Sequence, residues 1–285
     1  MNSIAKYFSL VKFSHTVFAM PFALIGFSLA VADERFNFSL KLLLLVILCM
    51  VFARNAAMGF NRIADRKIDA LNPRTKNREI PAGKISPAAA ILFVVINSVL
   101  FIAAAGFINK LTLFLSPVAL LVVLGYSYTK RFTSMSHFVL GLGLSLAPVG
   151  AYISVTGHFN LIPVLYSLIV ISWVSGFDII YSLQDDEFDR ENKLHSIPSL
   201  AGRRNSLIIS ALVHLITFIL VVAAGLLNGQ GYLFWTGAVI FMILLVYQHY
   251  IVSPDDLNRV NVAFGTTNGT ASIIFAAFTI ADLFF

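Results

Sequence analysis

The segment SLKLLLLVILCMVFARNAAMGF, residues 39–60, is a long apolar run whose only charged side chains are Lys41 and Arg54. A helix needs about 20 such residues to cross a bilayer core that is about 30 Å thick. The segment therefore predicts a membrane-spanning helix. Similar apolar runs lie on both sides of it, at about 14–32, 86–108, 111–128, 136–156, 161–183, 205–227, 231–251 and 262–284.

These runs predict an all-α fold, a multi-pass transmembrane helical bundle of about nine spans in a single domain over residues 1–285. The composition agrees, because 58% of the residues are hydrophobic and only 12% are charged. An average soluble domain has about 25% charged residues. A soluble globular protein is therefore excluded. The single cysteine, Cys49, leaves no possibility of an internal disulfide.

The basic residues predict the orientation of the chain in the membrane. If the N-terminus is cytoplasmic, sixteen of the 20 Lys and Arg residues fall in cytoplasmic segments, and only Arg35, Lys41 and Lys110 fall on the opposite side. This asymmetry favours a cytoplasmic N-terminus and a C-terminus on the far side of the cell (plasma or inner) membrane. The net charge is +6, but the position of the basic residues is more informative than their sum, and we expect no nucleic-acid partner.

Two long polar loops, 61–85 and 184–204, share a layout. Each follows an apolar helix, opens with an acidic cluster and closes on a proline and then a glycine. Four predicted spans separate the acidic cluster of the first loop from that of the second. This layout predicts two pseudo-repeated four-helix halves, about 1–130 and 131–255, followed by one further helix at about 262–284.

The first cluster consists of Arg54, Asn61, Asp65 and Asp69, which are spaced by seven, four and four residues. Steps of four and seven place these side chains on one helical face. Carboxylate and amide oxygens suit a hard divalent cation. A solvated helix end is the simpler alternative, but an arginine two turns inside a span is costly unless it is paired or functional. In the following loop, Arg74 and Arg78 could hold phosphate oxygens through their planar donors. Positive-inside bias explains these two arginines equally well.

The second cluster consists of Asp178, Tyr181, Asp185 and Asp189, spaced by three, four and four residues. With Asp186, it also forms a D-D-x-x-D pattern. Several carboxylates at one site repel each other, and their pKa values would rise without a counter-charge. Mg²⁺ relieves this repulsion and leaves coordination positions for substrate phosphates. Two such clusters that share a diphosphate would make it a good leaving group.

Three stretches resemble motifs of the UbiA-type aromatic prenyltransferases, and the resemblance covers most of the chain. Residues 61–83, NRIADRKIDALNPRTKNREIPAG, resemble the first motif of that family. Residues 181–189, YSLQDDEFD, followed by 195–202, HSIPSLAG, resemble the second, and Tyr126-x-x-x-Lys130-Arg131 resembles a stretch between the two. One departure is Arg62, where the family usually has Asp. This variant resembles the 4-hydroxybenzoate polyprenyltransferase-like branch.

The resemblance implies Mg²⁺-dependent transfer of a polyprenyl group from an isoprenoid diphosphate to a carbon of an aromatic acceptor such as 4-hydroxybenzoate. Diphosphate would be released, and the pathway would be ubiquinone or menaquinone biosynthesis. Polyprenyl diphosphate, an aromatic acid and membrane lipid are the expected partners. The resemblance implies that the catalytic residues, which hold Mg²⁺ together with Asn61, are Asp65, Asp69, Asp185 and Asp189. The residues expected to bind the diphosphate are Arg74, Arg78, Lys130 and Arg131. The residues expected to bind the acceptor are Arg54, Asp178 and Tyr181.

Two other functional classes fit the sequence less well. Intramembrane Arg54 and Asp178 could line the path of a transporter, although transporter sites lie near the midplane and these clusters lie at helix ends. A CDP-alcohol phosphotransferase would carry a D-G-x-x-A-R motif, which is absent from the sequence. Outside the clusters, His137 is expected at the membrane interface.

Overall fold

The computed structural model describes residues 3–11, 18–33 and 35–285, and within these ranges the regular structure is entirely helical. This result confirms the all-α prediction. The helices are α1 (Ser3–Leu10), α2 (Met20–Val31), α3 (Leu40–Ala64), α4 (Arg66–Leu71), α5 (Pro87–Gly106), α6 (Lys110–Thr129), α7 (Ser136–Thr156), α8 (Leu161–Ser182), η2 (Leu183–Asp185), α9 (Asp186–Glu191), α10 (Ile197–Leu227), α11 (Tyr232–Ile251), η3 (Val262–Thr267) and α12 (Asn268–Phe284).

Eight helical segments of the described residues are long and apolar enough to cross a membrane. They correspond to the second to ninth predicted spans. The first predicted span, 14–32, appears as the shorter apolar helix α2, and its residues 14–17 lie outside the described residues. The multi-pass prediction is therefore confirmed.

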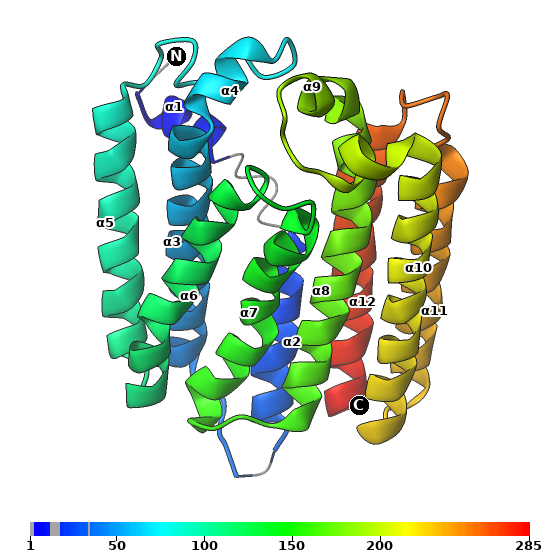
Figure 1. Ribbon diagram of the computed structural model, residues 1–285. Helices are drawn as coiled ribbons and strands as arrows, with labels where there is room; N and C mark the ends of the chain where they lie inside the picture. The colour runs from blue at the N-terminus through cyan, green and yellow to red at the C-terminus, as the bar shows by residue number, and fades with distance from the viewer. Residues whose placement is uncertain (1–2, 12–17, 34) are drawn as a thin grey trace.

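The long helices stand side by side in one bundle (Figure 1). On one side of the bundle lie α3, α5 and α6, and on the other α10, α11 and α12, with α2, α7 and α8 between them. The most buried of these helices is α8, which packs against both α7 and α10. Its Trp173 and Tyr166 belong to an aromatic core that includes Phe22 of α2 and Phe275 of α12. This core holds the central helices rigidly beneath the two polar loops.

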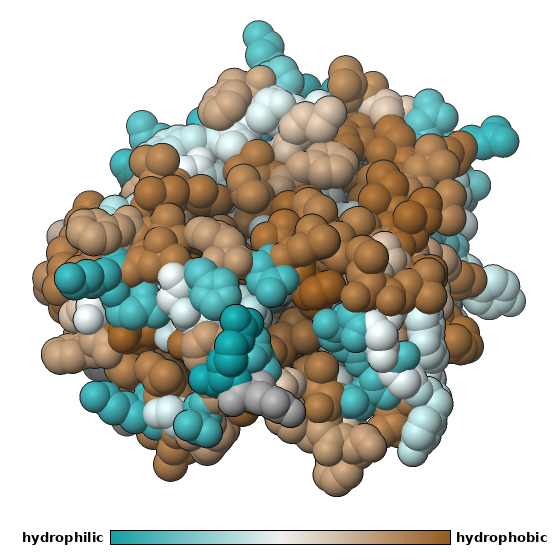
Figure 2. Space-filling model, turned by 90° about the horizontal axis from the view of Figure 1, so that it is seen from below, coloured by the Kyte–Doolittle hydropathy of each residue, from teal (hydrophilic) through white to brown (hydrophobic). Residues whose placement is uncertain are grey.

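The two motif loops project from the same end of the bundle. Helix α3 is followed by α4, and α8 continues through the 3₁₀ turn η2 into α9. In Figure 1, α1, α4 and α9 all lie at this end, whereas the C-terminal end of α12 lies at the other. Seen from that other end, the surface is largely apolar with scattered polar patches (Figure 2).

The structure departs from the sequence prediction in where α10 begins and in the backbone conformation at the start of the last span. Helix α10 begins at Ile197, before the expected residue 205, because Ser196 and Ser199 form a capping box and Pro198 occupies the first turn. Gly202 then interrupts its helical backbone with a φ of 76°. The last span begins with a π-helical segment, η3, before α12.

Candidate functional site

The first cluster lies where α3 gives way to α4. Asp65 is the residue between these two helices, so the single continuous helix that the spacing implied is broken there. Backbone hydrogen bonds from Asp65 N to Asn61 O (2.9 Å) and from Asp69 N to Asp65 O (2.8 Å) continue the four-residue repeat across the break. Both carboxylates are buried. The shared face predicted for them is therefore kept.

Basic side chains from two loops neutralise these buried carboxylates. Asp65 forms ion pairs with Lys130 Nζ at 2.9 Å and with Arg131 Nη2 at 3.1 Å, and it accepts a hydrogen bond from Asn61 Nδ2 at 3.2 Å. Asp69 pairs with Arg78 at 2.7 Å. A buried charge is strongly unfavourable without such partners. Three of the four residues predicted to bind diphosphate thus lie beside the first two aspartates.

Arg74, the fourth residue predicted to bind diphosphate, connects the first motif to the second. Its guanidinium donates two hydrogen bonds to the carboxylate of Asp185, one of them from Nε at 2.9 Å, and a third to Tyr181 Oη at 3.0 Å. Asn72 Nδ2 also donates to Asp185 Oδ1, at 3.0 Å. Partial burial of Arg74 opposes its charge, but the hydrogen bonds to Asp185, the charge of Asp185 and the contact with Tyr181 together outweigh burial and raise the pKa of the guanidinium. Loops more than 100 residues apart in sequence therefore meet in one charged site.

The rest of the second motif is tied to the loop that carries Lys130. The backbone N–H of His195 donates to the carbonyl of Lys130 at 2.7 Å. Asp189 lies within electrostatic range of Asp185 and Lys130. Asp186 instead forms a two-pronged pair with Arg203 of α10, at 2.9 and 3.0 Å. One carboxylate of the D-D-x-x-D pattern is therefore engaged in fastening α9 to α10.

His137 is buried in the first turn of α7, and its place at the membrane interface remains a prediction. Its imidazole is 3% exposed, and Nδ1 lies 2.7 Å from Asp178 Oδ2. Nε2 accepts a hydrogen bond from the backbone N–H of Ile197 at 3.3 Å. The contact forms because α7 packs closely on α8, and sequence spacing alone does not show which helices are neighbours.

Two arginines near the first cluster have buried nitrogens with no hydrogen-bond partner among the described residues: Nε of Arg54 and Nε of Arg62. The charge of Arg62 interacts with Asp69, so the departure from the family pattern places a buried cation beside that carboxylate. Tyr126 lies within electrostatic range of Arg54, Arg62 and Asp178. It therefore occupies a central place, which only its position in the Tyr-x-x-x-Lys-Arg stretch signalled in the sequence.

The oxygen donors of the two clusters fit Mg²⁺. Within the described part of the chain, no three His, Cys, Asp or Glu side chains lie close enough together to cage a metal ion. Mg²⁺ usually takes only one or two carboxylates and completes its shell with water and substrate phosphates. Asp69 Oδ2 is buried without a hydrogen-bond partner in the described residues. An oxygen ligand is thus available, and the substrate would supply the others.

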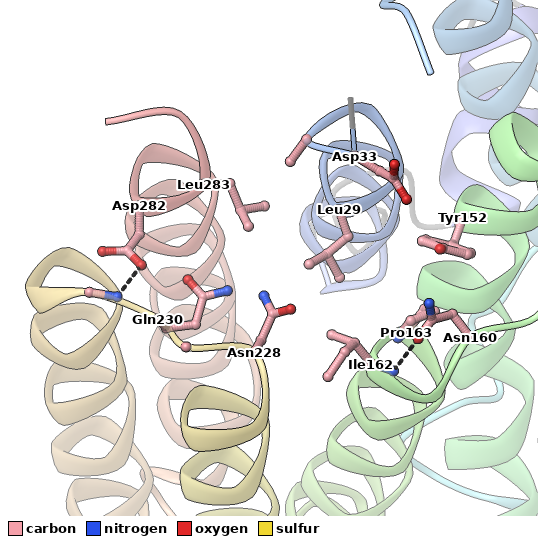
Figure 3. Close-up of a pocket in the computed structure, with 13 residues that line it drawn as sticks. Leu29, Asp33, Tyr152, Asn160, Ile162, Pro163, Asn228, Gln230, Asp282 and Leu283 are labelled. Atoms are coloured by element: carbon pink, nitrogen blue, oxygen red, sulfur yellow. Dashed lines mark hydrogen bonds between the residues drawn. The ribbon is translucent and has the colours of Figure 1, made fainter. Parts of the chain in front are cut away.

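A cavity of about 440 Å³ lies at the opposite end of the bundle (Figure 3). It is bordered by the ends of α2 and α12 and by the connections between α7 and α8 and between α10 and α11. Asp33, Asn160, Gln230 and Asp282 supply polar groups to it. None of the predicted site residues lines this cavity, so it is separate from the aspartate clusters.

The sequence of this chain matches one family of known proteins. A family model described as the UbiA prenyltransferase family matches residues 19–278. The chain is 32% identical over 244 residues to a 4-hydroxybenzoate octaprenyltransferase of Aliivibrio salmonicida, covering 85% of this chain and 84% of that protein. A second protein of that name, from Aliivibrio fischeri (strain ATCC 700601 / ES114), is 31% identical over the same coverage.

Solved structures agree with this match. The apo structure of a UbiA homolog from Aeropyrum pernix K1 has a TM-score of 0.85 and 33% identity, covering 94% of this chain and 98% of that one. A UbiA homolog from Archaeoglobus fulgidus bound to DMAPP and Mg²⁺ has a TM-score of 0.75 and 21% identity, covering 98% and 99%. This chain therefore belongs to the UbiA prenyltransferase family and is an integral membrane transferase.

Proposed function

We propose that this prenyltransferase transfers a polyprenyl group from an isoprenoid diphosphate to a ring carbon of a hydroxylated aromatic acid such as 4-hydroxybenzoate, in quinone biosynthesis. The proposal rests on the contacts between the two motif loops. Arg74 of the first loop binds Asp185 of the second, and Lys130 and Arg131 reach Asp65 from a third loop. Alternating carboxylates and cations suit a diphosphate together with its metal ion.

The diphosphate would lie between the two clusters. Asn61, Asp65, Asp69, Asp185 and Asp189 would hold Mg²⁺, which when bound neutralises the charge that develops on the departing diphosphate. Arg74, Arg78, Lys130 and Arg131 would donate to phosphate oxygens, exchanging part of their present pairing with aspartate for pairing with substrate. The Archaeoglobus fulgidus homologue is bound to Mg²⁺ together with GPP or DMAPP, which supports this arrangement.

The aromatic acid would lie deeper, beneath the diphosphate. The buried guanidinium of Arg54 is suited to its carboxylate, and Asp178 and Tyr181 would orient the ring. The bond between the allylic carbon and the diphosphate oxygen breaks, a ring carbon of the acceptor bonds to that allylic carbon, and the ring loses a proton. The prenyl tail would lie among the apolar helices and membrane lipid, where burial contributes about 0.8 kcal/mol per CH₂. The active-site loops and the N-terminus would face the cytoplasm.

The test is a substrate panel with the purified protein in lipid. The protein would be incubated with Mg²⁺, polyprenyl diphosphates of several lengths and several hydroxylated aromatic acids, and products identified by mass. We expect a prenylated acid and released diphosphate, with turnover abolished in Asp185→Ala. Asp255→Ala removes an exposed carboxylate from the loop between α11 and η3, and it should remain active. Near-normal turnover in folded Asp185→Ala would refute the metal assignment.

A further inference from the structure

We propose that His137 is a positioning residue that fixes Asp178 as a hydrogen-bond acceptor for the hydroxyl group of the aromatic substrate. His137 would thereby determine the preference for hydroxylated over unhydroxylated aromatic acids. The inference rests on the proposed function and deepens it, because it concerns how the same site recognises its acceptor.

The hydrogen bonds of His137 determine which nitrogen of its imidazole carries the proton. A backbone N–H is only a donor, so Nε2, which accepts from Ile197 N, carries no proton. The ring proton of the neutral imidazole is therefore on Nδ1, where it is donated to Asp178 Oδ2 over 2.7 Å. The imidazole is 3% exposed and cannot turn without losing both contacts. It holds one carboxylate oxygen of Asp178 in place.

The other carboxylate oxygen, Oδ1, takes part in none of the hydrogen bonds found among the described residues, and the Asp178 side chain is 21% exposed. The carboxylate therefore has an open side. The Tyr126 hydroxyl interacts electrostatically with both Asp178 and Arg54. Tyr126 of α6 thus lies near both a cation, Arg54 of α3, and a hydrogen-bond acceptor, Asp178 of α8.

An aromatic acid with a hydroxyl group fits this pair of charges. Its carboxylate would face Arg54, and its hydroxyl would donate to Asp178 Oδ1. An acid without the hydroxyl leaves Asp178 Oδ1 unpaired. A site built to hydrogen-bond a substrate hydroxyl discriminates strongly against an analogue that lacks it, because its own polar group loses its partner. Without His137, Asp178 would be free to rotate, and this discrimination would weaken.

His137 also connects this carboxylate to the rest of the site. It lies on α7, Asp178 on α8, and Ile197 at the first turn of α10, immediately after the second motif. His195 N, two residues before Ile197, is bonded to the carbonyl of Lys130. The imidazole therefore ties the acceptor position to the loops that would hold the diphosphate.

The experiment compares His137→Leu with His137→Gln in the full-length protein in lipid. Gln retains a donor for Asp178 and an acceptor for Ile197 N–H, whereas Leu has neither. In His137→Leu we expect the KM for 4-hydroxybenzoate to rise about tenfold, which is the effect of losing one hydrogen bond to a charged group. The KM for polyprenyl diphosphate and the inhibition constant of benzoate, which has no hydroxyl, should stay unchanged. His137→Gln should restore the KM to within about threefold of the wild-type value.

Ser210→Ala is the matched control, because it removes a buried 2.7 Å hydrogen bond from α10 to Gly176 O of α8 without touching Asp178. It should leave both KM values unchanged. If His137→Leu accumulates poorly, His137→Met fills similar space and gives the same comparison. Equal shifts for 4-hydroxybenzoate and benzoate, or no shift beyond that of Ser210→Ala, would overturn the role of His137. A wild-type protein that prenylates no hydroxylated aromatic acid would overturn the proposed function and this inference together.

Discussion

Arg74 connects the two motif loops of this chain through its contacts with Asp185 and Tyr181. It reaches across to Asp185 with two guanidinium nitrogens and to Tyr181 with the third, and it lies 5.4 Å from the centre of the Tyr181 ring. A planar guanidinium makes such a set of contacts and an ammonium group does not, because lysine presents a compact point charge. The shape of the arginine, rather than its charge alone, therefore joins the loops.

Arg74→Lys tests this distinction at the residue scale. The substitution keeps the charge but loses the paired hydrogen bonds, so we expect the KM for polyprenyl diphosphate to rise about tenfold. The KM for the aromatic acceptor should change less, because Arg74 contacts the acceptor site only through Tyr181. Steady-state kinetics with each substrate varied in turn measures both values.

Lys76→Gln is the control, because Lys76 is an exposed basic residue of the same loop. It should have wild-type kinetics. Equal losses in Arg74→Lys and Lys76→Gln would show that only the overall positive charge of the loop matters.

At the scale of single elements, Gly202 shapes the first turns of α10. Its φ of 76° is a backbone conformation that favours glycine, and it interrupts the helix just before Arg203. Arg203 then returns to Asp186 and Glu187 of α9. Because of the break at Gly202, α10 can begin within the second motif loop and then continue as a membrane span.

Gly202→Ala should destabilise the protein by about 1–3 kcal/mol, because a φ of 76° combined with a ψ of 167° is a backbone conformation essentially restricted to glycine. No atom lies within 4 Å of the added Cβ, so the cost is conformational and not steric. Gly150→Ala, also without nearby atoms but without a positive φ, should be neutral or stabilising. Thermal unfolding in detergent measures both, and equal midpoints would contradict the argument.

The contact between α2 and α7 depends on a different glycine. A Cβ on Gly26 would lie 2.0 Å from the carbonyl oxygen of Pro148, so the two helices approach closely only because the side chain is missing. Gly26→Ala should force α2 away from α7, with a cost of about 1–3 kcal/mol or more. We expect a lower unfolding midpoint and a larger aggregated fraction in gel filtration. Gly150→Ala, on α7 itself, again serves as the control, and an unaltered Gly26→Ala protein would show that α2 adapts without cost.

At the scale of the whole molecule, both motif loops and α1 lie at one end of the bundle (Figure 1). The aspartates thus lie at helix ends, whereas the transporter alternative required a site near the midplane. The cavity at the opposite end is bordered by Asp33 and Asp282 and has none of the basic residues of the motif loops. The two ends therefore differ in charge as well as in the segments that form them.

Cysteine labelling tests the proposed orientation of these ends. In a Cys49→Ser background, which has no other thiol, Asn77→Cys and Asn192→Cys place single thiols in the two motif loops. Asn228→Cys places one at the opposite end, beside the cavity. An impermeant maleimide should label only Asn228→Cys in intact cells, and all three after permeabilisation. Labelling of Asn77→Cys in intact cells would reverse the orientation.

The local sequence predicts the membrane spans and the kind of ligand that the two clusters suit. Hydropathy over about 20 residues is a local property, so the spans were found to within a few residues, apart from the early start of α10. The types of residue in the two clusters indicated a metal and a diphosphate because carboxylates, amides and arginines have fixed donor and acceptor properties. The division into two repeated halves remains a prediction.

Which side chains contact each other depends on how the helices pack in the tertiary structure. Arg74 with Asp185, Asp186 with Arg203 and His137 with Asp178 are pairs between distant segments. Their contacts depend on how α7, α8 and α10 pack, and helix packing depends on the fit of whole surfaces rather than on spacing within one element. His137 lies in the first turn of α7, and only the packing of α7 on α8 shows that it is buried against Asp178.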